Sequence, residues 1–281
     1  MKRHLLRLLR WLGLGAAASL GLICLLLILG YGFVQSESGR QRLVEFLNQQ
    51  LSTPGSSEVR IGRLQGNLLQ RIEIHELSLS DGDGGWLQLN LIAANWRPRD
   101  LLNGRLSISN LVIEGLIVSR APRVAESSGE FQWAGLPLAV SIDKFSLGDA
   151  KLEQPLLGEK VVLRASGDTV IEGADLVRST IVITRVDATA GQARLEMKLQ
   201  PRSRTLQLKL DLDEAGGGVI TRLLDIEGFP ALSIQADGQG PFDAFQGNAS
   251  LQLGELAFIE SRFIVAADGQ PGLKLEGRSR I

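Results

Sequence analysis

Leu-Gln-Leu-Lys-Leu-Asp-Leu, residues 206–212, alternates strictly between aliphatic and polar side chains. Because successive side chains of a β-strand point to opposite faces of a sheet, this stretch predicts a strand with one apolar face and one solvated face. The apolar residues of an amphipathic helix would instead recur every three or four positions. The stretch therefore favours a β fold with an apolar side.

The same two-residue alternation recurs through most of the chain after residue 56. Aliphatic residues alternate with polar ones at 72–79, 87–91, 106–113, 181–183, 195–199, 251–253 and 273–275. Two interruptions predict short helices: Pro98 stands at a helix-start position before Gly104, and residues 219–226 follow three glycines. We therefore predict a mainly β fold of antiparallel strands, with short helices, over residues 56–281.

An apolar pattern with a two-residue gap occurs three times at a fixed interval. It begins at Ile74, Ile108 and Ile142, so its starts are 34 residues apart (108 − 74 and 142 − 108). A period of this length is also typical of helical repeats, but the two-residue alternation excludes them. The pattern predicts a repeated unit of strand, bulge and strand, with His75 at the first bulge.

The amino-terminal segment indicates a membrane anchor. Residues 11–34 carry no charge, and a helix of about 24 residues reaches about 36 Å, enough to cross a bilayer. Four basic residues precede this run: Lys2, Arg3, Arg7 and Arg10. The positive-inside rule therefore places the flank 1–10 in the cytoplasm and the bulk of the chain on the other side of the membrane. A cleaved signal peptide is the alternative, although its apolar core is usually shorter.

Residues 35–55 predict an amphipathic collar helix and a linker. Between residues 36 and 51 the apolar residues gather on one helical face: Leu43, Val44, Phe46, Leu47 and Leu51. The following Thr-Pro-Gly-Ser-Ser, residues 53–57, ends the helix. We expect this helix to lie on or just above the membrane.

The residue counts argue against an enzyme. The chain has two His residues, His4 and His75, and one Cys, so clusters of the kind that form zinc sites or Cys/His nucleophiles are absent from the sequence. Residues 81–85, Asp-Gly-Asp-Gly-Gly, lack the ligand pattern of an EF-hand and favour a hairpin turn. With 30 basic and 31 acidic residues the net charge is −1, which does not indicate nucleic-acid binding. We expect no catalytic residue, no metal and no cofactor.

Two short motifs are Ile-Gly-Arg-Leu-Gln-Gly-Asn-Leu at 61–68 and Leu-Leu-Asn-Gly-Arg-Leu at 101–106. Both resemble the membrane-proximal part of the TamB family, the inner-membrane subunits of the translocation and assembly module. Further similar segments are 38–40, 43–48, 77–83, 86–87, 96–98 and 113–116, followed at a distance by 240–247. The similarity covers about residues 1–122 and is thinner beyond them.

This resemblance implies an elongated β-trough of the AsmA-like group with an apolar interior. It implies a single-pass protein of the inner (cytoplasmic) membrane with a cytoplasmic amino terminus and a periplasmic bulk. Family members act in outer-membrane biogenesis, in phospholipid transport and in the assembly of outer-membrane β-barrel proteins and autotransporters. They are usually much longer and end in a further carboxy-terminal domain, so we expect this chain to be a fragment. An outer-membrane TamA-like β-barrel partner would be contacted through the missing part.

The apolar strand faces are the candidate binding surface. Their alternation fits a closed sandwich core and an open trough equally well, and the few aromatic residues and the family resemblance favour the trough. The predicted lining of a groove for phospholipid acyl chains consists of Leu195, Met197, Leu199, Leu206, Leu208 and Leu210. The alternative function is a structural periplasmic adaptor that docks an outer-membrane partner through a strand edge without carrying lipid.

Overall fold

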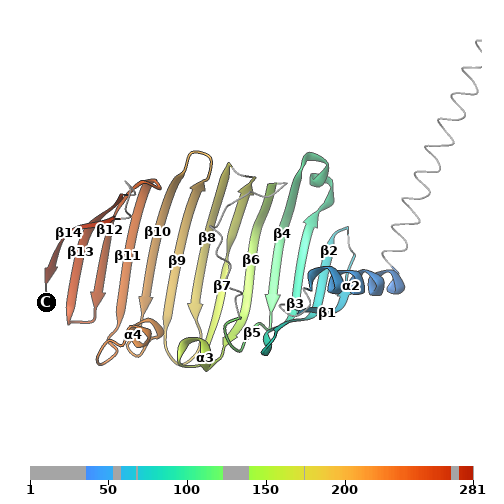
Figure 1. The fold of residues 1–281 in the computed structure, drawn as a ribbon, viewed down its shortest axis with the longest axis horizontal. Helices are drawn as coiled ribbons and strands as arrows, with labels where there is room; N and C mark the ends of the chain where they lie inside the picture. Colours follow the sequence, from blue (N-terminus) through green and yellow to red (C-terminus); the bar gives the residue numbers. More distant parts are fainter. Residues whose placement is uncertain are drawn as a thin grey trace, which may run out of the picture.

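The computed structural model describes residues 36–52, 58–67, 69–122, 139–173, 175–266 and 272–280, and from residue 265 onward it describes only the backbone. This part of the chain forms one sheet of fourteen strands with a few helical segments (Figure 1). The mainly β architecture expected from the alternation is therefore confirmed. The strands are β1 (Glu58–Gln65), β2 (Arg71–Asp81), β3 (Gly84–Arg97), β4 (Arg105–Glu114), β5 (Ile117–Val118), β6 (Ala139–Leu152), β7 (Val161–Glu172), β8 (Leu176–Arg185), β9 (Gly191–Gln200), β10 (Thr205–Glu214), β11 (Leu232–Pro241), β12 (Ala244–Leu253), β13 (Ala257–Ala266) and β14 (Gly272–Arg280).

Strands that follow each other in sequence lie side by side along nearly the whole sheet and pair antiparallel. The exception is β6, which runs parallel to β4 and to the two-residue strand β5. The expectation of antiparallel strands throughout is therefore wrong at this junction. Two parallel neighbours cannot be joined by a tight hairpin, because the second strand begins at the same rim as the first.

The described helical segments are α2 (Glu37–Leu51), η1 (Pro98–Asn103), α3 (Gln154–Leu157) and α4 (Val219–Leu223). The helix predicted over 36–51 is present as α2, and its expected place on or just above the membrane stays a prediction. The side chain of its N-cap Ser36 accepts a hydrogen bond from the Gly39 backbone N–H at 3.1 Å. The predicted short helix at Pro98 is a 3-10 helix, and it ends at Gly104, whose φ of 68° suits glycine. Helix α3 was not predicted.

The predicted cytoplasmic flank 1–10 and membrane anchor 11–34 lie outside the described residues. Within the described ranges, no helix combines the length and apolar character needed to cross a membrane. The anchor and its orientation therefore stay predictions.

One face of the sheet is apolar from β1 to β13, because register pairs place aliphatic residues opposite one another. Cross-strand partners share a face, so the apolar character passes from strand to strand. Examples of such pairs are Ile74 with Ile92, Ile92 with Ile113, Ile113 with Leu147, Ile181 with Leu195, Leu195 with Leu210 and Ile234 with Leu251. We call this side the apolar face and the opposite side the polar face.

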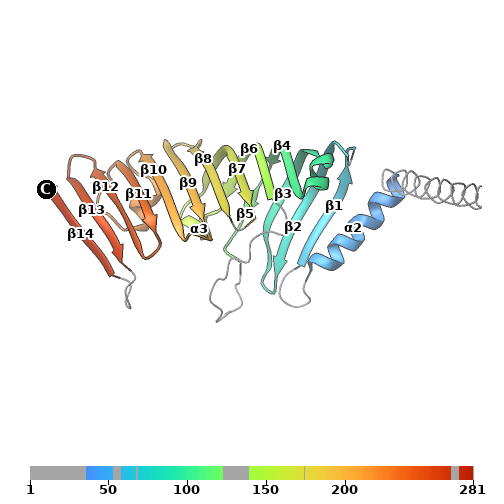
Figure 2. The same cartoon turned by 90° about the horizontal axis from the view of Figure 1, so that it is seen from above.

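The sheet is a single layer. The main contacts between elements join neighbours in the sheet, apart from α2 on β1 and η1 on β4. In Figure 2 the described residues form no second sheet against either side, and the strands at the two ends of the sheet tilt in opposite directions, so the sheet twists along its length. Only nine hydrophobic side chains are buried among the described residues, which is few for a sheet of this size. The closed sandwich core considered from the sequence is not the arrangement of this part of the chain.

Backbone irregularities keep the apolar residues on one face where the alternation shifts by one. Ile108 pairs with Ile142 and Leu111 pairs with Phe145, so residues three apart share the apolar face. The register shifts at this point between β3 and β4 and between β6 and β7. In β2 the irregular residue is Glu76, next to His75, with a φ of 58°. The predicted bulge is therefore present in β4 and β6, whereas in β2 the register with both neighbouring strands continues through His75 and Leu77 without a shift.

Candidate apolar binding face

The structure brings all six predicted groove residues together on two adjacent strands. Leu206 pairs with Leu199, Leu208 with Met197, and Leu210 with Leu195. All six side chains are half-buried, so neighbouring strands cover their flanks while part of each stays in contact with solvent. Two strands thus present a ladder of three apolar pairs to an uncovered side of the sheet.

The apolar face becomes flatter beyond β10. The partners of Leu206, Leu208 and Leu210 on β11 are Gly240, Gly238 and Ala236. Small residues continue on β12, where Gly247 pairs with Gly238 and Ala249 with Ala236. The six predicted groove residues therefore lie beside strands whose side chains on this face are small.

Aromatic rings lie over three of the glycines on this face. A Cβ added to Gly167 would lie 2.8 Å from the Phe145 ring, and one added to Gly247 would lie 2.8 Å from the Phe263 ring. Phe245 covers Gly238 in the same way, at 2.6 Å from the added atom. The rings of Phe245 and Phe263 are 5.9 Å apart between centroids. Sequence reasoning missed these pairs, because each depends on the register between strands.

Helix α2 closes the apolar face at the β1 edge. Its Val44 forms a buried cluster with Ile61 and Leu64 of β1. Partly buried neighbours complete the cluster: Leu43, Leu47, Ile72, Ile74 and Leu77. Phe46 and Leu51, which were expected on the same helical face, are instead 56% and 52% exposed. The packed side of α2 is therefore narrower than predicted.

Asn48 of α2 and Ser52, the C-cap of this helix, also bind the backbone edge of β1. The Asn48 side chain accepts a hydrogen bond from the Ile61 N–H at 2.8 Å and donates one to the Ile61 carbonyl at 3.2 Å. Ser52 does the same at Val59, at 2.9 and 3.2 Å. Asn48 and Ser52 are four residues apart, which is about 6 Å along a helix, and Ile61 and Val59 are two residues apart, which is about 6.7 Å along a strand. Because these two distances are similar, each side chain reaches one of the two strand residues. The helix thus replaces a further strand at this edge.

A small hollow opens on the apolar face below α3 and α4. Its volume is about 190 Å³. Residues from β7 to β10 form its floor, and the two short helices flank it; its apolar lining is Leu157, Val161, Leu163, Ile183, Ala193, Leu212, Val219 and Ile220. None of these residues was in the predicted groove, which lies further along the same strands.

A buried ionic cluster seals one side of this hollow. The Arg185 side chain is 6% exposed and contacts Asp187 at 2.7 Å and Glu159 at 3.0 Å. Arg222 of α4 reaches the same Glu159 at 3.7 Å. Burial raises the pKa of Asp187, but hydrogen bonds from the backbone N–H groups of Thr189 and Val162 and from Arg185 outweigh it, so this pKa is lowered overall.

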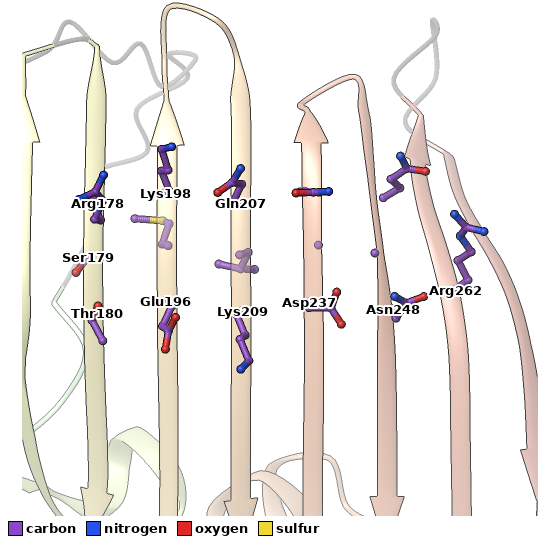
Figure 3. A pocket seen from close by; sticks show the side chains of 16 residues that line it. Arg178, Ser179, Thr180, Glu196, Lys198, Gln207, Lys209, Asp237, Asn248 and Arg262 are labelled. Atoms are coloured by element: carbon purple, nitrogen blue, oxygen red, sulfur yellow. The ribbon is translucent and has the colours of Figure 1, made fainter.

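The opposite, polar face carries rows of charged and amide side chains. Figure 3 shows such residues lining a hollow of about 510 Å³ over β8 to β13. One row runs through Thr180, Glu196, Lys209, Asp237, Asn248 and Arg262. Its charges alternate in sign from Glu196 to Asp237, as expected for a solvated face stabilised by cross-strand pairs. Within the described ranges no group of three or more His, Cys, Asp or Glu is placed to hold a metal ion.

The Asp-Gly-Asp-Gly-Gly segment forms a hairpin turn, as predicted. Strand β2 ends at Asp81 and β3 begins at Gly84. Both carboxylate oxygens of Asp81 accept hydrogen bonds from Arg120, which also donates to the Gly84 carbonyl at 2.7 Å. This carboxylate therefore fastens the segment after β5 to the hairpin.

Comparison with protein-family models, curated proteins and solved structures found no match for this chain. The resemblance to the TamB family rests on its sequence motifs alone.

Proposed function

We propose that this chain is the membrane-proximal part of a TamB-like protein, anchored in the inner membrane, whose apolar face shields acyl chains during outer-membrane biogenesis. The observation that carries the proposal is the uncovered apolar face from β1 to β13. Soluble proteins rarely expose contiguous apolar patches larger than a few hundred Å², and larger ones mark interaction sites. A lipid tail is the ligand that matches such a surface without polar recognition groups.

The energetics of this face suit weak, sliding contact with an alkyl chain. Each methylene group removed from water contributes about 0.8 kcal/mol. Half-buried side chains such as Leu208 cover only one side of a bound tail, so only part of this gain is realised. An open face therefore supports movement along the sheet, whereas a closed pocket would hold the lipid.

Site-specific photo-crosslinking at neighbouring residues tests the proposal. A photoreactive residue at Leu208 faces the apolar side, and the same residue at Lys209 faces the polar side, one position further along β10. In cells, we expect Leu208 to capture phospholipid at least fivefold more than Lys209, as measured by mass spectrometry of the adduct. Equal capture at the two positions would contradict the proposal.

A charge introduced at Leu208 distinguishes an open face from a closed core. We expect Leu208→Asp to fold, because the introduced carboxylate keeps access to water on an uncovered face, and to lower lipid capture at neighbouring positions. In a closed core an unpaired charge costs several kcal/mol and the variant would unfold. Circular dichroism of the purified variant distinguishes the two results.

The adaptor hypothesis predicts a different outcome. It requires docking of a partner through a strand edge, with no stoichiometric lipid on the protein. In the described part of the chain, α2 occupies the β1 edge, and β14 pairs only with β13. Absence of lipid at both crosslinking positions, together with partner adducts along β14, would favour the adaptor.

A further inference from the structure

The apolar face is not uniform along its strands, and the hollow below α3 and α4 marks one end of it. Along β10 the apolar residues run from Leu206 to Leu212, a distance of about 20 Å for six residues. Leu212 lines the hollow, whereas Leu206 lies toward the opposite rim, next to the turn that joins β9 to β10. Next to β10, the rim with the hollow is walled by two helices, and the other rim is formed by the turn between β9 and β10.

The size of the hollow suits the end of an alkyl chain. An apolar cavity of about 150 Å³ stays dry and binds benzene, which has six carbons. The hollow of about 190 Å³ therefore has room for roughly six to eight carbon atoms. A whole phospholipid is much too large for it, so a bound lipid would extend out along the strands.

The charged groups around the hollow disfavour an anionic lipid headgroup. The Arg185 guanidinium contacts Asp187 and Glu159 inside the buried cluster, although its Nη1 atom has no hydrogen-bond partner among the described residues. Both carboxylate oxygens of Glu214 accept hydrogen bonds from the backbone N–H groups of Val219 and Ile220. Three carboxylates, of Asp187, Glu159 and Glu214, outnumber the two guanidinium groups of Arg185 and Arg222, so a phosphate placed here would meet excess negative charge.

We propose that this hollow receives the terminal methyl end of an acyl chain that lies along β9 and β10. This inference rests on the proposed function and adds the direction of the ligand. The polar end then lies near the β9–β10 turn, where Arg204 is exposed to solvent. Acyl chains are held parallel to the strands with their tails toward α3 and α4.

Two photoreactive palmitic acid analogues test this orientation. One carries a diazirine next to its terminal methyl group, and the other carries it near the carboxyl group. Each is incorporated into phosphatidylcholine vesicles with the full chain, irradiated, and located by peptide mass spectrometry. We expect the terminal probe to label peptides from 154–163 and 212–223, and the carboxyl-side probe to label 199–206.

A substitution that fills the hollow tests whether the terminal methyl end binds there. Ala193 lies on its half-buried floor, between Ile183 and Leu212, so Ala193→Phe fills space without crowding a closed core. We expect this variant to lower terminal-probe labelling of 154–163 and 212–223 at least fivefold. The control is Ala236→Phe, the same change on the same face outside the hollow, and it should alter this labelling less than twofold. Both variants should keep the wild-type circular dichroism spectrum.

The outcomes separate the orientation from the proposed function. Reversed or identical labelling by the two probes, or no effect of Ala193→Phe, overturns the orientation while leaving the apolar face as a lipid surface. Absence of labelling anywhere on the apolar face overturns both.

Discussion

Gly167 shows how a single residue sets the spacing of two strands. A Cβ at this position would overlap the Thr180 carbonyl oxygen and lie 2.8 Å from the Phe145 ring. We expect Gly167→Ala to destabilise the protein by about 2 kcal/mol, because backbone and ring both have to shift. Gly82→Ala is the control, since nothing lies within 4 Å of its added atom, and it should change stability by less than about 0.5 kcal/mol. Thermal melting followed by circular dichroism measures both, and equal melting temperatures would refute the steric argument.

Asp187 gives the sheet an acid-sensitive contact. Its pKa is lowered from 3.8 by folding, so the unfolded chain takes up its proton first as the pH falls. The stabilising contribution is complete above about pH 4 and is lost as the pH falls through the lower folded value. We expect the melting temperature of Asp187→Asn to lie below that of wild type at pH 6, with a gap that narrows below pH 4. A gap independent of pH would show that the carboxylate charge has no part in the contact.

At the scale of the element, α2 acts as a cover for an exposed strand. Asn48 and Ser52 saturate backbone groups that would otherwise pair with another chain, as unprotected edge strands tend to do. We expect Asn48→Ala combined with Ser52→Ala to destabilise the helix contact by about 2–4 kcal/mol, from two lost partners per residue, and to promote dimers through β1. Size-exclusion chromatography measures the dimer. The control is Gln49→Ala, which changes an exposed residue of the same helix and should leave the protein monomeric. If the double variant is also monomeric, the apolar packing of α2 alone is enough to protect the β1 edge.

Local sequence patterns predicted the elements that depend on near neighbours. The alternation of Leu206 to Leu212 predicts β10, and Pro98 with Gly104 predicts a helical turn, because each signal lies within a few residues. The parallel pairing of β4 with β6 was not predicted, since it depends on where the intervening chain returns. Ile108 and Ile142, which are 34 residues apart, are register partners in this pair. Ile74, which lies 34 residues before Ile108, is instead aligned through Ile92 with Ile113.

The candidate site was predicted only in part, because it also depends on contacts between distant parts of the chain. The six aliphatic residues of β9 and β10 follow from alternation and lie together on one face. The hollow combines floor residues such as Leu163 with Leu157 and Ile220 of helices that follow two different strands. A four-residue helix such as α3 has too few residues for a helical period to be recognised.

At the scale of the whole molecule, the twelve strands in line from β1 to β13, at about 4.8 Å spacing, give an apolar face about 53 Å long. Under the proposed function, lipid entering beside α2 reaches β12 only if this face is continuous. Ile181 on β8 faces the apolar side between Gly167 and Leu195, whereas Val182 faces the polar side, and both are half-buried. We therefore expect Ile181→Asp to interrupt the path and Val182→Asp to leave it intact.

Crosslinking on either side of this block measures continuity. Photoreactive residues at Ile92 and Leu251 lie on the apolar face before and after β8. With Ile181→Asp, we expect lipid capture at Ile92 to stay near wild type and capture at Leu251 to fall at least fivefold. Val182→Asp is the control for a general effect of an added charge. It should leave lipid capture at both positions within twofold of wild type. If capture at Leu251 persists with Ile181→Asp, lipid reaches the far strands directly from solution, and the face binds acyl chains locally without conducting them along the sheet.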